Sequence, residues 1–178
     1  IVIAGAGSGK TRVLTYRIAN LMREGVDAFN ILALTFTNKA ANEMKERIGG
    51  LVGNERARYL QMGTFHSVFA RILRAESNHV GLTSNFTIYD EEDSRSLIKN
   101  IVRQMGLDDK IYKPSTIHSV ISMQKNRLWS AGQYAEDGEL LERDRRRNMP
   151  ETYKIFRLYE QRLQQANAMD FDDLLVQT

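Results

Sequence analysis

Eight residues near the start of the chain have types and spacing that can do chemistry: Ala4-Gly5-Ala6-Gly7-Ser8-Gly9-Lys10-Thr11. Glycines let a backbone turn sharply, so that successive N–H groups can point inward at one anion. A lysine at the end of such a loop can reach phosphate oxygens, and the hydroxyl of a following threonine can bind Mg²⁺. The pattern therefore predicts a phosphate-binding loop for a nucleoside triphosphate.

The first of the eight positions is glycine in the strict form of this loop and Ala4 here, a small residue that leaves the cradle intact. We expect residues 4–9 to hold the phosphates of ATP, Lys10 to reach its β- and γ-phosphates, and Thr11 to bind the accompanying Mg²⁺. The alternative is a turn rich in glycine and serine that joins a strand to a helix and binds nothing.

The elements around this loop predict a parallel sheet. Apolar runs at 1–4 and 31–34 are typical of buried strands. Helical spacing of apolar residues follows each run, at 10–24 and at 40–48, and the glycine pair at 49–50 is expected to end the second helix. Strand–helix–strand–helix in this order predicts a right-handed βαβ unit.

The pattern changes after about residue 90, where helical spacing dominates and no further strand of the first type is expected. We therefore predict a first part of an α/β core over 1–90, an inserted and mostly helical subdomain over 91–166, and a return to the core over 167–178. The helices expected in the subdomain cover 94–105, 115–129 and 151–166.

Composition narrows the classes of protein. Hydrophobic residues make up 42% and charged residues 26% of the 178 residues, which excludes a wholly disordered chain. No apolar run is long enough to span a membrane. The lack of cysteine excludes disulfides and thiolate metal sites and favours a reducing, cytoplasmic location. Residues 1–78 carry a net charge of +5 and residues 79–178 a net charge of −2, so a polyanionic partner is expected on the first half.

Hydrolysis of a bound triphosphate also needs an acidic residue at a strand end, to hold the metal and orient water. The nearest acidic cluster, Asp170-Phe171-Asp172-Asp173, precedes its apolar residues and follows no evident strand. It is more typical of a helix start, with Asp170 or Asp172 near the N-cap. A metal-binding role for the cluster is the alternative.

Two further segments distinguish this chain among proteins with a phosphate loop: the run from Leu34-Thr35-Phe36-Thr37-Asn38 to Met44, and Gly63-Thr64-Phe65-His66-Ser67. Together with residues 4–14 and with Met169-Asp170-Phe171-Asp172-Asp173, they resemble the superfamily 1 DNA helicases of the UvrD/Rep/PcrA branch. The segments occur in the order of that family. The resemblance covers nearly the whole chain and is weak from about 95 to 150.

The resemblance implies a RecA-like sheet, incomplete in this chain, with an inserted helical subdomain. It places Arg12 beside the adenine ring and Phe36 against a base of single-stranded DNA. Hydroxyl, amide and imidazole groups suit phosphate oxygens without reading bases, and an exposed aromatic ring can stack on any base. The residues expected to contact DNA are Thr35, Phe36, Asn38, Thr64 and His66.

Each of these residues has a structural alternative. Phe36 and Phe65 could be core residues, and Thr37 or Asn38 could cap the following helix. The basic residues 145–147 could hold the phosphates of duplex DNA or form a solvated helix face. We favour the solvated face, because acidic residues are interleaved with the basic ones. Trp129 is expected in the core.

The family resemblance implies that the parent protein is an ATP-dependent helicase that moves 3′ to 5′ in repair or replication. Its partners would be single-stranded DNA, the duplex at a fork and a second RecA-like domain of the same polypeptide. Because that domain and the acidic strand lie outside these residues, we expect this fragment to be inactive alone. The alternatives are a helicase subunit of a recombination nuclease, a non-motor nucleotide-binding protein such as a small-molecule kinase, and a DNA-binding platform without catalysis.

Overall fold

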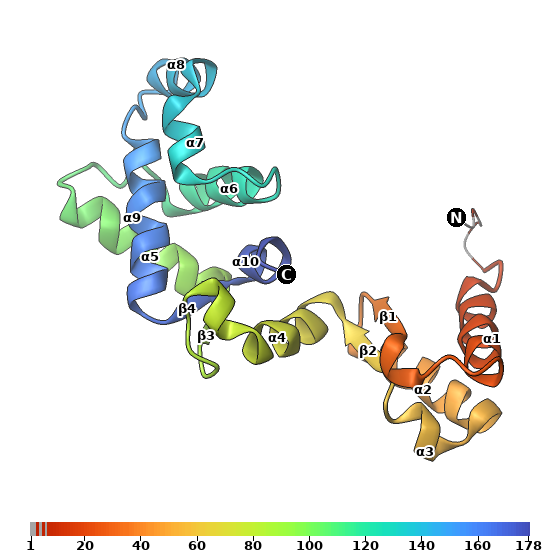
Figure 1. Ribbon diagram of the computed structural model, residues 1–178. Coiled ribbons are helices and arrows are strands. Elements are labelled where there is room, and N and C mark those ends of the chain that lie inside the picture. The colour runs from red at the N-terminus through yellow and green to blue at the C-terminus, as the bar shows by residue number, and fades with distance from the viewer. Residues whose placement is uncertain (1–2, 4, 6) are drawn as a thin grey trace. The chain divides into compact units, whose positions relative to one another are not determined.

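The computed structural model of the protein describes residues 3, 5 and 7–178, which form two compact units, Ile1–Val68 and Phe69–Thr178 (Figure 1). Each unit combines helices with a two-stranded parallel sheet, so the α/β class with parallel strands is confirmed. The division into core, inserted subdomain and return at residues 90 and 166 stays a prediction. Among the described residues, no helix is both long enough and apolar enough to cross a membrane.

The first unit contains two longer helices and a pair of short strands, and α4 begins in it and runs on into the second unit. In chain order its elements are α1 (Lys10–Arg23), the 3-10 helix η1 (Ala28–Asn30), β1 (Leu32–Thr35), α2 (Asn38–Val52), α3 (Asn54–Ala57), β2 (Gln61–Thr64) and α4 (Phe65–Ala75).

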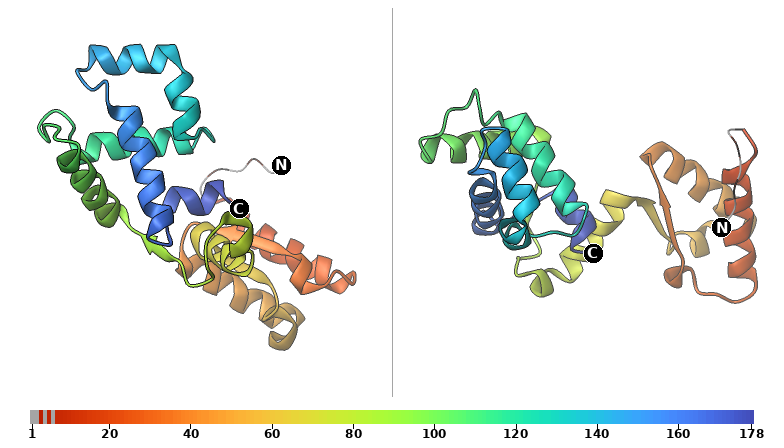
Figure 2. Two further views of the ribbon diagram at one scale, coloured as in Figure 1. Left: turned by 60° about the vertical axis from the view of Figure 1, so that its left-hand side comes forward. Right: turned by 90° about the horizontal axis from the view of Figure 1, so that it is seen from above.

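The core of the first unit forms where α1 and α2 pack against each other (Figure 2). Ile18 and Met22 are buried one turn apart on α1, and Met44 and Ile48 repeat the same spacing on α2. Apolar residues of β1 and β2 complete this core, among them Ala33.

Two expectations about this unit need correction or lie beyond the described residues. The helix predicted to end at Gly49-Gly50 continues as α2 to Val52, and its C-cap is Gly53, whose φ of 94° favours glycine. Gly49 is instead buried against Asn54: a Cβ at Gly49 would meet Asn54 Oδ1 at 2.1 Å. The glycine thus serves the packing of α3 and not the end of α2. The strand predicted over 1–4 lies largely outside the described residues, and Ile3 itself is exposed and outside any strand.

The second unit is mostly helical, as the spacing after residue 90 predicts. After α4 its elements are the 3-10 helix η2 (Ser77–Val80), β3 (Thr87–Tyr89), α5 (Glu91–Gln104), α6 (Pro114–Lys125), α7 (Ala131–Glu136), α8 (Gly138–Arg146), α9 (Thr152–Gln165), β4 (Ala168–Asp170) and α10 (Phe171–Val176).

The core of the second unit is built around α9, which packs against α5 and α7 (Figure 1). Phe156, Tyr159 and Leu163 form the buried stripe on α9, as their helical spacing predicts. Trp129 is only half-buried, so the expectation of a core tryptophan is not met in full.

A strand that the sequence analysis excluded is present at the end of the chain. β4 pairs in parallel with β3, in the register Tyr89 with Asp170, and it ends in that aspartate. The expectation that no strand ends in an acid here is therefore wrong. A strand of three residues is too short to show a period of two, and only the pairing with β3 defines it.

Gly63 lets α4 start directly after β2. Ser67 and Val68 fold back over this buried glycine, and a Cβ there would lie 2.6 Å from Ser67 Oγ and 3.0 Å from Val68 Cγ2. The missing side chain therefore permits the sharp turn from strand to helix at Thr64 and Phe65.

We expect Gly63→Ala to lower the free energy of unfolding by about 1–3 kcal/mol, because the added methyl group has no room. Urea unfolding followed by circular dichroism measures this. The matched control is Gly50→Ala in α2, where the Cβ meets open space and alanine should stabilise the helix by about 0.5–1 kcal/mol. Equal stability of Gly63→Ala and the wild type would contradict the packing argument.

Candidate functional site

The predicted phosphate loop closes on its own backbone in the structure. Ser8 Oγ donates a hydrogen bond to the carbonyl oxygen of Gly5 at 2.7 Å, and Lys10 Nζ donates to the same oxygen at 2.6 Å. Gly7 and Gly9 have φ angles of 74° and 80°, a left-handed conformation that favours glycine. Ala4 and Ala6 lie outside the described residues. The described part of the loop therefore has the tight turn that the sequence predicts.

The helix after the loop starts in a way that suits an anion. Gly9 is the N-cap of α1 and provides no side-chain cap, and the first turn of α1 contains no acidic residue. The N–H groups of the first turn and the positive end of the helix dipole are thus not offset by a carboxylate. Lys10, Thr11 and Arg12 occupy this first turn and are all exposed.

The carboxyl ends of β1 and β2 bring together the two segments that are expected to contact DNA. The strands are paired with Thr35 opposite Thr64, so the residues that follow, Phe36 and Phe65, emerge at the same edge. Their rings lie 5.8 Å apart between centroids and are tilted by 50°. The Phe36 side chain is 92% exposed, so the alternative that it is a core residue is wrong, whereas Phe65 is half-buried.

Local hydrogen bonds shape the backbone around these rings. Thr35 Oγ1 donates to the carbonyl oxygen of Thr37 at 2.9 Å, and Thr37 Oγ1 accepts from Ala40 N at 3.1 Å as the N-cap of α2. Thr64 Oγ1 donates to Ser67 Oγ at 3.0 Å. Asn38 and His66 are exposed in the first turns of α2 and α4 respectively. The capping role considered for Thr37 or Asn38 therefore belongs to Thr37.

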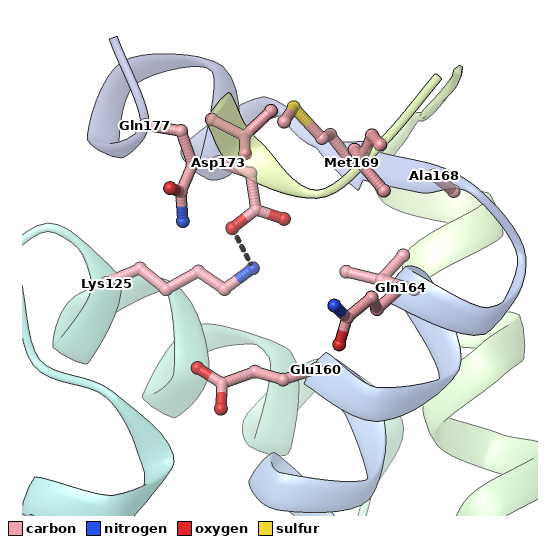
Figure 3. Close-up of a pocket in the computed structure, with 10 residues that line it drawn as sticks. Lys125, Glu160, Gln164, Ala168, Met169, Asp173 and Gln177 are labelled. Carbon is pink, nitrogen blue, oxygen red and sulfur yellow. Dashed lines mark hydrogen bonds and ion pairs between the residues drawn. The ribbon is translucent and has the colours of Figure 1, made fainter. Parts of the chain in front are cut away.

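The acidic cluster near the end of the chain caps a helix and forms ion pairs with a buried lysine. Asp170 is the N-cap of α10, as predicted, and forms a capping box with Asp173. The amine of Lys125, on α6, lies 2.7 Å from Asp170 Oδ2 and 2.7 Å from Asp173 Oδ1, and the lysine side chain is only 4% exposed (Figure 3). Tyr159 donates a hydrogen bond to Asp170 Oδ2 at 2.9 Å. We call Lys125, Tyr159, Asp170 and Asp173 the lysine node.

Burial and charge set opposing pKa shifts within the node. Burial alone would lower the pKa of Lys125, but the attraction of Asp173 and Asp170 outweighs it and the pKa ends above its ordinary value. Burial alone would raise the pKa of Asp170, but Lys125 brings it below the ordinary value. Burial and then the charge of Asp170 raise the pKa of Tyr159, so its phenol stays protonated.

A cavity of about 240 Å³ lies beside the lysine node, and Figure 3 shows Glu160 and Gln164 on its far side from Asp173. Burial raises the pKa of Glu160. The carboxylates of Asp170 and Asp173 hold Lys125, and Asp172 Oδ1 accepts a hydrogen bond from Asn126 Nδ2 at 2.9 Å, so all three carboxylates of the cluster already have partners. Across residues 3, 5 and 7–178 no group of three or more His, Asp or Glu side chains is placed to hold a metal ion.

The basic run on α8 behaves largely as a solvated helix face. Arg145 and Arg146 are exposed and make ion pairs with Glu142, one turn away, at 3.6 Å and 3.4 Å. Arg143 instead lies partly buried, 3.5 Å from the buried carboxylate of Asp144. A role of Arg145 to Arg147 in holding duplex DNA stays a prediction.

Lys125 is not among the residues predicted from the sequence, although the spacing of α6 contains a signal for its burial. Ile117, Ile121 and Lys125 recur every four residues, so the lysine continues the buried stripe of α6. A charge on an apolar stripe indicates a buried partner, but only the fold identifies Asp170 and Asp173 as that partner.

Comparison with known proteins assigns the whole chain to one protein family. A family model described as the UvrD/REP helicase N-terminal domain matches residues 1–178. The chain is 48% identical over 184 residues to the ATP-dependent DNA helicase UvrD1 of Mycobacterium bovis, and all of the chain and 23% of that protein are covered. It is 44% identical over 179 residues to the ATP-dependent DNA helicase PcrA of Staphylococcus epidermidis, with all of the chain and 24% of that protein covered. The chain thus spans about a quarter of these relatives.

We expect Lys125→Met to lower the free energy of unfolding by about 3–5 kcal/mol, because it leaves two buried carboxylates without their cation. Urea unfolding followed by tryptophan fluorescence measures this in the second unit, since Trp129 is the single tryptophan of the chain. The control, Arg146→Met, removes only an exposed ion pair and should change the value by less than about 1 kcal/mol. Similar losses in both variants would contradict a special role for the node.

The raised pKa values of Lys125 and Tyr159 predict that the protein loses stability in alkali. Both groups bind their protons more tightly when folded, so their contribution is fully present below about pH 10 and is lost as the pH rises further. Urea unfolding between about pH 8 and about pH 11 should show a falling free energy of unfolding. Tyr159→Phe should make this fall shallower, and an unchanged slope would contradict the assignment.

Proposed function

The chain belongs to the family of the UvrD/REP helicase N-terminal domain, and we propose that it is the part of an ATP-dependent DNA helicase that binds ATP and single-stranded DNA. Because the chain covers about a quarter of the relatives that it matches, the activity is proposed for the full-length protein. We infer a RecA-like arrangement for the sheet that β1 and β2 begin.

One observation carries this proposal: a phosphate loop and a fully projecting aromatic ring occur in the same unit. The loop leads into α1, while Phe36, 92% exposed, follows β1. An exposed phenylalanine at a strand end gives a stacking surface to any base. A small-molecule kinase has no need of such a ring.

The proposed nucleotide contacts follow from the loop. The backbone of residues 5–9 and the first turn of α1 would surround the phosphates, with Lys10 leaving the carbonyl of Gly5 to reach them. The Thr11 hydroxyl would hold Mg²⁺, which when bound neutralises charge on the phosphates. The open helix start, free of acidic residues, fits this anion and its metal.

The proposed DNA contacts lie at the carboxyl ends of β1 and β2. Phe36 would stack on a base, and Thr35, Asn38, Thr64 and His66 would donate to phosphates, which gives binding without sequence preference. Movement from 3′ to 5′, contact with the duplex at a fork, a second RecA-like domain in the same polypeptide and a cytoplasmic location belong to this proposal by resemblance.

We expect ATP hydrolysis by the full-length protein to be strongly stimulated by single-stranded DNA and to be abolished by Lys10→Ala, which removes the cation that reaches the phosphates. Phosphate release, measured with and without DNA, tests both points. Hydrolysis that ignores DNA would favour a non-motor enzyme. DNA binding without any hydrolysis would favour a platform that has lost catalysis.

We expect Phe36→Ala to weaken binding of single-stranded DNA to the full-length protein by about 1–3 kcal/mol, the usual contribution of one stacked base. Fluorescence anisotropy of a labelled oligonucleotide measures this. Phe29→Ala is the matched control, because Phe29 is also an exposed phenylalanine, 66% accessible, but it precedes β1 instead of following it. Equal weakening by the two variants would refute the proposed stacking role of Phe36.

A further inference from the structure

A hollow of about 330 Å³ in the first unit lies directly beside the start of α1. It is lined by Arg12, Thr15 and Tyr16 of α1 and by Arg47 and Leu51 of α2. Arg12 immediately follows the two residues proposed to hold the phosphates and Mg²⁺. A nucleotide anchored at Lys10 and Thr11 therefore has this hollow within reach of its remaining parts.

The chemistry of the walls favours a flat, electron-rich group. Arg12 and Arg47 carry planar guanidinium groups, which stack on aromatic rings as well as binding anions. Glu43 forms an ion pair with Arg47 at 3.9 Å, so Arg12 is the guanidinium at this hollow without an ion pair among the described residues. A purine base is a flat, electron-rich group on which such a guanidinium can stack.

Arg12 stands in an unfavourable electrostatic position for a cation. It lies in the first turn of α1, at the positive end of the helix dipole, and that turn contains no acidic residue. Within residues 3, 5 and 7–178, Arg12 makes no ion pair. A long arginine side chain without such a restraint has considerable rotational freedom, which it must lose when it contacts a ligand.

Tyr16 supplies the restraint. It follows Arg12 by four residues, which places both side chains on the same face of α1. The guanidinium carbon of Arg12 lies 5.7 Å from the centroid of the Tyr16 ring, within the range of a cation–π interaction. The ring of Tyr16 also lines the hollow, beside the arginine that it holds.

We propose that Tyr16 is a positioning residue for the nucleotide base, and that its ring holds Arg12 at the hollow between α1 and α2 where the base is received. This inference rests on the proposed function, since it takes ATP as the ligand of the loop. Tyr16 contributes to affinity for the base-bearing nucleotide and leaves the affinity for its phosphates unchanged.

The test compares two ligands in the full-length protein with Mg²⁺: ATP, and inorganic tripolyphosphate, which has the phosphates without the base. Isothermal titration calorimetry measures both. Tyr16→Ala should weaken ATP binding about two- to five-fold, the value of an exposed cation–π contact, and leave tripolyphosphate binding unchanged. Tyr16→Phe keeps the ring and should bind ATP like the wild type.

The outcomes separate this inference from the function on which it rests. Unchanged ATP affinity in Tyr16→Ala overturns the inference, and so does an equal loss for both ligands, which would indicate damage to the fold or to the phosphate loop. A loss in Tyr16→Phe as large as in Tyr16→Ala overturns the role of the ring. If Lys10→Ala binds ATP like the wild type, the proposed function itself fails, whatever Tyr16 does.

Discussion

The parallel pairing of β1 with β2 is the constraint on which the candidate DNA site depends. Its register sets Thr35 opposite Thr64, so two segments almost thirty residues apart in the chain end at one edge. Phe36 and Phe65 then meet at a centroid distance of 5.8 Å, with Phe36 projecting into solvent. A register shifted by one residue would move every side chain of one strand to the other face of the sheet.

Gly63 determines how the chain continues at this edge of the sheet. Because α4 turns back over Gly63 at once, the carboxyl end of β2 leads straight into a helix and not into a loop. Phe65 and His66 are therefore carried by the first turn of a regular element, which holds side chains more rigidly than a loop does. The predicted phosphate loop also leads directly into a helix, because Gly9 is both the last loop residue and the N-cap of α1.

In the second unit, an acidic cluster that resembles a metal site holds a buried lysine instead. Asp170-Phe171-Asp172-Asp173 has the composition of a metal site, yet two of its carboxylates surround the buried amine of Lys125. A single buried lysine between two carboxylates needs further hydrogen bonds to be tolerated, and the phenol of Tyr159 supplies one of them. The node joins α6, α9 and the β4–α10 corner of this unit, and its charges are therefore structural.

The sequence by itself determined the tight glycine-rich turn before α1, the succession of α1, β1 and α2 in the first unit, the helical character of the second unit and the family. Each of these rests on short-range spacing or on a motif, which the chain carries locally. Only the tertiary structure decided that α2 continues through Gly49-Gly50, that β4 exists, that Phe36 is exposed and that Lys125 is buried between Asp170 and Asp173. These features depend on contacts that no local spacing predicts. Gly49 packs against Asn54 of α3. The strand β4 exists only through its pairing with β3, and Lys125 finds its first carboxylate 45 residues further along the chain. A single sequence does not encode such partners in any local pattern, because they are brought together only when the chain folds.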